Sequence, residues 1–169
     1  VELPHTVNEK PLTVISAGAF KNNKTVETII VPSSVTTIET EAFSGCTSLK
    51  TIVFEVRTRS ETLTLSVSQI SGNVRIESGV ISIGDRAFYG CENLSAIDLS
   101  SIRSIGENAF AGCKALKDLT LSDQLTTVKA GAFSECASLK NVYLPATVEY
   151  LGRAAFSGCA GLESVVFEV

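Results

Sequence analysis

Five cysteines are the side chains of this sequence best suited to metal binding or nucleophilic chemistry, and their spacing argues against both. They are Cys46, Cys91, Cys113, Cys136 and Cys159. Structural zinc sites gather four ligands around one ion, commonly from close Cys-x-x-Cys pairs, and no such pair occurs here. An odd cysteine count also argues against a disulfide framework. We therefore expect no metal site, and we expect the thiols to act as small groups that satisfy backbone atoms inside the fold.

Catalysis would need a general base beside a nucleophile, and the chain has one histidine, His5, in an irregular N-terminal segment. Any cysteine or serine nucleophile would depend on that single side chain. The carboxylates are scattered: Glu27, Glu41, Glu55, Asp85, Glu107, Asp123 and Glu163. A glycosidase-type carboxylate pair could form only across neighbouring strands. The glycines lack the lysine and hydroxyl residue of a phosphate loop. The sequence predicts a protein that is not an enzyme and has no cofactor.

An alanine–phenylalanine pair recurs along the chain and organises all of these residues. The phenylalanines are Phe20, Phe43, Phe88, Phe110, Phe133 and Phe156, and Leu65 completes a register with steps of 22 or 23 residues. A repeat of this length is the signature of a solenoid, in which each coil buries its apolar side against the next. Each cysteine follows its phenylalanine by three places. Stacked coils would bring neighbouring cysteines within disulfide range, but their side chains would run parallel.

Apolar residues recur six, nine and eleven places after each phenylalanine, as at Leu139, Val142 and Leu144. The last two are separated by one residue, which is the spacing of a strand with one buried face. A second apolar pair lies eight and five places before each phenylalanine, as at Leu125 and Val128. The pattern predicts a mainly β solenoid with one short parallel strand per coil, a second shorter strand, turns on the other side, and little or no regular α-helix.

The chain is expected to form a single repeat domain over residues 1–169, with about seven coils. Residues 55–71 form an irregular third coil, because Arg57, Ser60 and Ser71 fall where other coils have core aliphatics. The segment Glu61–Ser68 alternates polar and apolar residues, which predicts an additional strand. The chain lacks methionine and its last residues form an apolar strand. We expect a fragment of a longer protein, or self-association through an open C-terminal edge.

The charge and hydropathy of the chain exclude two classes of partner. The net charge is −4, the isoelectric point is near 5.1, and lysine and arginine do not cluster. Nucleic acid is therefore not an expected ligand. The mean hydropathy is +0.27, yet no stretch reaches the roughly 18 apolar residues of a membrane span.

The repeating unit resembles a known family. The unit Ile-Gly-x-x-Ala-Phe-x-Gly-Cys-x-x-Leu-x-x-Ile-x-Leu, read over residues 105–121 and echoed over 151–167, is similar to the BspA-type, or treponemal, leucine-rich repeat. The resemblance implies a leucine-rich-repeat solenoid from an extracellular or cell-surface protein. Family members are typically secreted or surface proteins of mucosal bacteria and some protozoan parasites, several of them linked to adhesion. It implies a protein or glycan ligand on a host or microbial surface, but no ligand-contacting residue carries over.

The register predicts which side chains could contact such a ligand. In each strand, the residue between the two buried positions should point outward. The residue two places before it in the sequence should point outward as well. From these rows we select the first candidate surface: Arg75, Asp98, Asp118, Thr120, Asn141 and Tyr143. Aromatic and adaptable polar groups of this kind are enriched in binding sites. The break in the repeat supplies a second candidate surface: Arg57, Arg59 and Glu61. The alternatives are ordinary solvent-facing strand residues and a decayed coil.

Two functions remain open at this level. The first is a non-catalytic interaction module that binds a host or microbial macromolecule through its strand face. The second is a structural spacer that presents another domain of a longer protein, which could itself be an enzyme.

Overall fold

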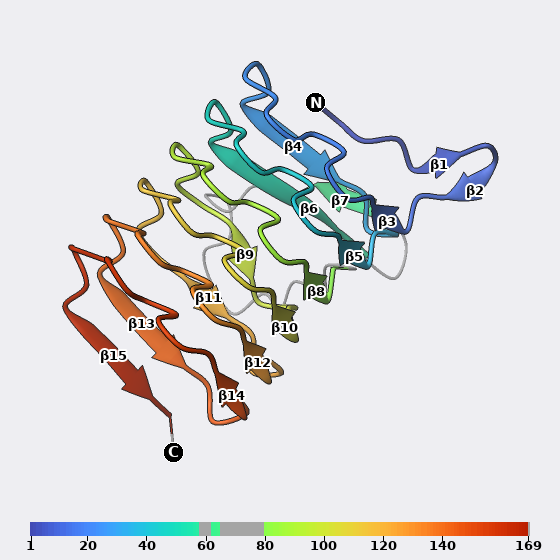
Figure 1. Cartoon of the computed structure of the whole chain (residues 1–169). Helices are drawn as coiled ribbons and strands as arrows, with labels where there is room; N and C mark the ends of the chain where they lie inside the picture. The colour runs from blue at the N-terminus through green and yellow to red at the C-terminus, as the bar shows by residue number, and fades with distance from the viewer. Residues whose placement is uncertain (58–61, 65–79, 169) are drawn as a thin grey trace.

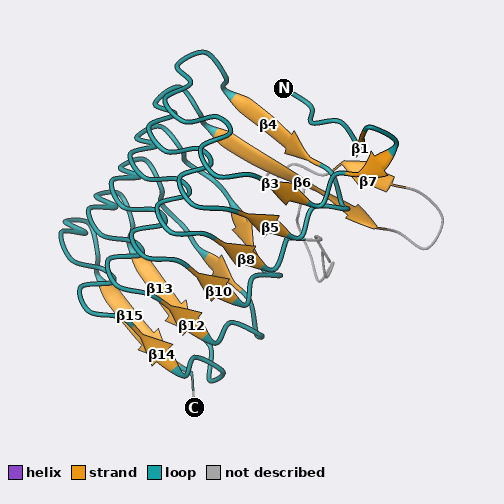
Figure 2. Ribbon diagram, turned by 45° about the vertical axis from the view of Figure 1, so that its right-hand side comes forward, coloured by secondary structure: helices purple, strands orange, loops and turns teal. Residues whose placement is uncertain are grey.

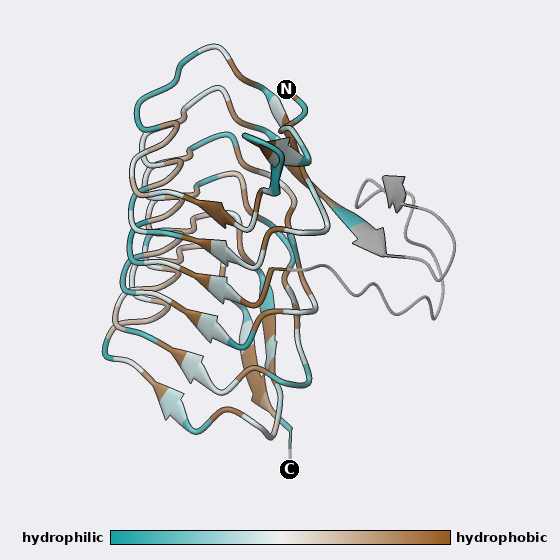
Figure 3. Ribbon diagram, turned by 90° about the vertical axis from the view of Figure 1, so that its right-hand side faces the viewer, coloured by the Kyte–Doolittle hydropathy of each residue, from teal (hydrophilic) through white to brown (hydrophobic). Residues whose placement is uncertain are grey.

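The solenoid places two strands of each coil on two separate sides of the chain (Figures 1 and 2). The computed structural model describes residues 1–57, 62–64 and 80–168. Among them there is no helix. The coils stack so that the two termini lie at opposite ends of the molecule (Figure 3). The predicted β solenoid with two strands per coil is confirmed.

We call one side face A. Its strands are β4 (Thr28–Val31), β6 (Thr51–Arg57), β9 (Asp98–Leu99), β11 (Thr120–Leu121), β13 (Asn141–Leu144) and β15 (Ser164–Phe167). Parallel pairing joins β4 to β6, β9 to β11, and β13 to β15. Single parallel bridges, Thr51 with Ala96 and Asp118 with Asn141, connect these pairs. Face A is therefore one continuous surface across six coils.

The other side, which we call sheet B, carries the shorter strands. They are β3 (Val14–Ile15), β5 (Thr37–Ile38), β8 (Ser82–Ile83), β10 (Ser104–Ile105), β12 (Thr127–Val128) and β14 (Tyr150–Leu151). All six pair in parallel in the order β14-β12-β10-β8-β5-β3. In each two-residue strand from β5 to β12 the second side chain is buried, so sheet B closes the core opposite face A.

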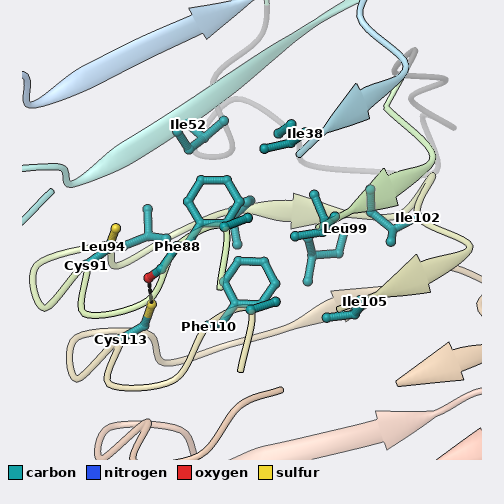
Figure 4. Packing of buried hydrophobic residues seen from close by; sticks show 14 of the residues in the cluster. Ile38, Ile52, Phe88, Cys91, Leu94, Leu99, Ile102, Ile105, Phe110 and Cys113 are labelled. Atoms are coloured by element: carbon teal, nitrogen blue, oxygen red, sulfur yellow. Dashed lines mark hydrogen bonds between the residues drawn. The ribbon is translucent and has the colours of Figure 1, made fainter. Parts of the chain in front are cut away.

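The phenylalanines form an internal stack, as their register predicts. Consecutive rings lie 5.1 to 5.5 Å apart between centroids, with interplanar angles of 3° to 14°. Phe43, Phe88, Phe110 and Phe133 are fully buried. Figure 4 shows two of these rings, Phe88 and Phe110, among the buried leucines and isoleucines. Stacked aromatic pairs contribute about 0.5–1.5 kcal/mol each beyond the burial of their area. The stack therefore fixes which side chains face outward.

The backbone beside each ring adds a third ladder of hydrogen bonds. The Phe43 amide donates to the Ala87 carbonyl at 2.7 Å, and the Phe110 amide donates to the Ala132 carbonyl at 2.7 Å. The residue two places after each phenylalanine has positive φ, from +58° to +76°. Glycine fills four of these six positions, since it adopts this conformation without steric cost. The turns opposite the strands are thus paired between coils as well.

The described residues form about six turns, one fewer than the predicted count of about seven. The Phe43 and Phe88 rings stack directly at 5.2 Å, and β5 pairs directly with β8. No coil therefore lies between them, and the stack has about six turns. The physical reason lies in residues 55–71, where arginine and serine replace the aliphatics that a coil must bury. Leu65 and most of this predicted third coil lie outside the described residues.

Two additions interrupt the regular stack. A short antiparallel hairpin, β1 (Thr6–Val7) with β2 (Lys10–Pro11), precedes the first coil. After the second coil, β6 continues to Arg57 and pairs antiparallel with β7 (Thr62–Thr64). The strand β7 falls within the segment for which alternation predicts an additional strand, so that prediction is confirmed for its described part.

Candidate functional site

The cysteine ladder has the structural role that the spacing predicts. Each thiol donates a hydrogen bond to the carbonyl of a phenylalanine in the preceding coil. The Sγ–O distances are 3.0 Å for Cys46 and Cys91, 3.3 Å for Cys113 and Cys136, and 3.1 Å for Cys159. Figure 4 shows the bond from Cys113 to the Phe88 carbonyl. Asn23 takes the same position in the first coil, where its Oδ1 accepts from the Thr25 and Val26 amides at 2.9 Å.

Burial and hydrogen bonds between neighbouring cysteines set the acidity of these thiols. Burial raises the pKa of Cys113, which has no exposed surface. Cys159 is only half-buried, and a hydrogen bond with the Cys136 thiol lowers the pKa of Cys159 to about 7. The ladder is therefore inert in its middle and acidic at Cys159.

Face A brings five residues of the first candidate surface together. Strand register sets Asp98 beside Thr120 and Tyr143 beside Val166, and the Asp118–Asn141 bridge links the two strand pairs. Asp118, Thr120, Asn141 and Tyr143 are all exposed. The Tyr143 side chain is 57% exposed and its neighbour Val166 is 41% exposed. We call the group Asp98, Asp118, Thr120, Asn141 and Tyr143 the Tyr143 patch.

Two members of the Tyr143 patch are already engaged by neighbouring groups. Asp98 is half-buried, and its Oδ1 accepts a hydrogen bond from the Ser100 amide at 2.8 Å. The Oδ1 of Asn141 accepts from the Ser164 hydroxyl at 2.7 Å. Tyr143, Thr120 and Asp118 therefore have the most surface to offer a partner.

The N-terminal end of face A is covered rather than open. Ile30 is half-buried, and Val53, in the same outward row, is 6% exposed. The register predicts that the Val53 side chain points outward into solvent. That prediction is wrong, because Val53 is buried. Arg75, Arg59 and Glu61 lie outside the described residues. Arg57 ends β6, where its backbone pairs with Thr62.

Sheet B carries a groove, lined by both polar and apolar side chains, that the sequence reasoning missed. Its volume is about 370 Å³, and its lining includes Ser82, Ser104, Asp85, Glu39 and Lys129. The signal in the sequence is a hydroxyl residue six places before successive phenylalanines, at Thr37, Ser82, Ser104 and Thr127.

The charged groups of this groove bind neighbouring coils. Asp85 Oδ1 accepts from the Glu107 amide at 2.8 Å and lies 3.2 Å from Lys129 Nζ. The Glu107 amide, and secondarily Lys129, lower the pKa of Asp85. Glu39 Oε2 accepts from the Ala17 amide at 2.9 Å. The charged side chains that line the groove therefore link neighbouring coils to one another.

His5 does not sit beside a nucleophile of the ladder. Its Nε2 lies 3.5 Å from Glu55 Oε1, and the two side chains are 52% and 4% exposed. Of the described residues, none belongs to a helix that is long and apolar enough to cross a membrane.

Comparison with known proteins shows which family and which solved structures the chain is similar to. The model of the BspA type leucine rich repeat region, in six copies, matches residues 13–71 and 64–169. The T. pallidum leucine rich repeat protein is similar at 28% sequence identity and a TM-score of 0.79. The match covers 98% of this chain and 68% of that one. No curated protein matches the chain.

Two further solved structures are similar. A leucine rich cell surface protein from Faecalibacterium prausnitzii A2-165 has 27% identity and a TM-score of 0.64, over 98% of this chain and 46% of that one. The chain thus spans less than half of that relative. The pneumococcal vaccine antigen PcpA has 24% identity and a TM-score of 0.58, over 95% of this chain and 44% of that one, and this likeness shows the fold alone.

Proposed function

The chain belongs to the BspA-type leucine-rich repeat family, and from this premise we propose that it is a non-catalytic interaction module of a secreted or surface-attached protein. Repeat domains of this family are typically non-catalytic, and one relative is named as a cell surface protein. The partner is a protein or glycan on a host or microbial surface, and the domain acts in adhesion. The contact is made through face A.

The observation that carries this proposal is the Tyr143 patch. Tyr143 is more than half exposed, whereas the phenylalanines of the internal stack are buried or partly buried. Val166 is its exposed neighbour on β15, and Thr120 and Asp118 lie on the preceding coil. An exposed aromatic side chain surrounded by short polar groups has the composition of a binding hot spot. Adjacent coils make it one surface from residues far apart in sequence.

The test is a binding screen of the chain against matrix proteins and glycans, followed by titration of each hit. We expect Tyr143→Ala to weaken binding at least about tenfold, since hot-spot aromatics dominate interface energy. Tyr150→Ala is the matched control, because Tyr150 is 55% exposed and lies on sheet B. Equal effects of the two changes would contradict the assignment to face A.

The structural spacer remains a second candidate function. The half-buried Asp98 and the engaged Asn141 favour it, because these polar groups already serve the coils themselves. The chain also covers only part of its longer relatives. If no matrix protein or glycan binds, the spacer becomes the better description.

A further inference from the structure

Three side chains of the types that bind transition metals meet where the N-terminal segment passes β6. They are Glu2, His5 and Glu55, and one ligand atom from each lies within 4.8 Å of the other two. His5 is the only histidine of the chain. In the part of the chain that the structure describes, no other group of three such side chains gathers this closely.

Glu55 departs from the repeat at its own position. The equivalent position, twelve places after the phenylalanine, is Pro32, Ser100, Ser122 or Pro145 in four other coils and Glu168 in the last coil. Glu55 is 4% exposed, and the exposed neighbour Glu2 brings a second negative charge close to it. A buried carboxylate is costly unless a cation or hydrogen-bond donors compensate it. A cation beside Glu55 and Glu2 would compensate both negative charges.

The backbone holds the other two ligands in place. Glu2 forms a parallel bridge with Ile30 of β4, and the Leu3 amide donates to the Ile30 carbonyl at 3.0 Å. Leu3 is 7% exposed and so anchors this segment in the core. The His5 carbonyl accepts from the Leu12 amide at 2.9 Å. Glu2 and His5 are therefore fixed beside the coil that carries Glu55.

We propose that Glu2, His5 and Glu55 form a zinc site that fastens the N-terminal segment to β6. Zinc binds imidazole nitrogen and carboxylate oxygen at about 2.0–2.2 Å in a tetrahedron, which sets neighbouring ligand atoms about 3.4 Å apart. His5 Nε2 and Glu55 Oε1 already lie 3.5 Å apart. Only Glu2 must approach further, and its exposed side chain is free to rotate.

The charge and ligand types fit the same ion. Two carboxylates and a neutral imidazole give a site of charge −2, which a divalent cation offsets. Calcium and magnesium prefer oxygen-only sites, whereas imidazole favours zinc and neighbouring transition metals. A water molecule would fill the fourth position of the tetrahedron, and the ion would hold the N-terminal segment against β6.

The first experiment titrates the untagged full chain with zinc against a chromophoric chelator. We expect one zinc per chain, and His5→Gln and Glu55→Gln each to weaken binding at least about tenfold. Glu2→Gln should weaken it as well, and it tests the proposal at an exposed residue whose change leaves the fold intact. Glu92→Gln is the control, because Glu92 is an exposed carboxylate paired with Lys114 on a later coil. Undiminished binding in the three variants overturns the proposal.

Two readouts separate this site from the cysteines. The chain has one histidine, so a single imidazole signal in the NMR spectrum should shift at one equivalent of zinc. Cobalt(II) in place of zinc should give weak visible bands without thiolate charge transfer. A strong thiolate band, or an imidazole signal that zinc leaves unchanged, overturns the proposal. An unchanged signal would mean that His5 and Glu55 form an ordinary ion pair.

Discussion

At the scale of single residues, the cysteines show how a reactive side chain becomes structural. A thiol is small enough for the space beside each phenylalanine, and its weak donor satisfies a carbonyl of the preceding coil. Asn23 does related work in the first coil with a side-chain oxygen that accepts from two amides. This position, three places after each phenylalanine, therefore requires a short side chain that can hydrogen-bond. The reactivity of the thiol is not what the position requires.

Alkylation should distinguish the most reactive cysteine from the fully buried ones. We expect iodoacetamide to modify Cys159 first, because the pKa of Cys159 is lowered to about 7 and its side chain is only half-buried. A lowered pKa means that the reactive thiolate accumulates at lower pH, so the rate should rise as pH increases through about 7. Peptide mass spectrometry gives the rate at each cysteine.

Cys113 is the internal control for this prediction. It is fully buried and burial raises its pKa, so it should react only when the chain unfolds. Modification of Cys113 as fast as Cys159 in the folded protein, or a rate for Cys159 that rises only near pH 9, would contradict the pKa assignment.

At the scale of elements, coil-to-coil distance is set by backbone contact at particular glycines. A Cβ on Gly106 would lie 2.5 Å from the Asp85 amide nitrogen and the Gly84 carbonyl carbon. Both are backbone atoms of the neighbouring coil, so no side-chain rotation relieves the contact. Gly90 is different, since its φ is +68° but nothing lies within 4 Å of a Cβ there.

This contrast predicts unequal costs for the same substitution. Gly106→Ala should lower the free energy of unfolding by at least about 3 kcal/mol, because two coils must separate. Gly90→Ala should cost about 1–2 kcal/mol, which is the price of a left-handed conformation for a residue with a Cβ. Urea denaturation of both variants measures the difference. Similar losses for both would show that sheet B is not held by this close approach.

The elements also show how far sequence reasoning reaches. Spacing from the phenylalanines predicts both strands of every coil, the turn positions and the outward row on β9, β11, β13 and β15, because each depends only on period. It fails between Phe43 and Phe88. Their separation of 45 residues equals two periods, 22 and 23, so Leu65 falls in register, although the Phe43 and Phe88 rings stack directly on each other.

The candidate sites could also be predicted where they lie in regular coils, and could not where they involve segments outside the repeat. Asp118, Thr120, Asn141 and Tyr143 could be predicted to share a surface, because they lie in regular coils. The burial of Val53 and the meeting of Glu2, His5 and Glu55 could not. They depend on a segment before the first coil, and a segment outside the repeat has no register from which its contacts follow.

At the scale of the whole molecule, a stack of coils has two ends, and each end exposes what internal coils bury. Beyond β14 and β15 no described strand continues the two sheets. The side chains there include Phe167 at 59% exposure and Leu151 at 38%. Phe167 aligns with Leu144, which is fully buried one coil earlier. Among the described residues, β14 and β15 thus pair on one side only and carry apolar surface, which favours pairing with a further coil or with another chain.

We propose that the 169-residue chain, taken by itself, associates with a second copy through its C-terminal edge. Sedimentation equilibrium should show a monomer–dimer equilibrium, and Phe167→Lys should raise the dissociation constant at least about tenfold, since an edge lysine opposes strand pairing. Tyr89→Lys is the matched control, because Tyr89 is an aromatic side chain with 41% exposure in an internal coil. A monomer at all concentrations, or equal effects of the two lysines, would show that this edge does not pair with itself.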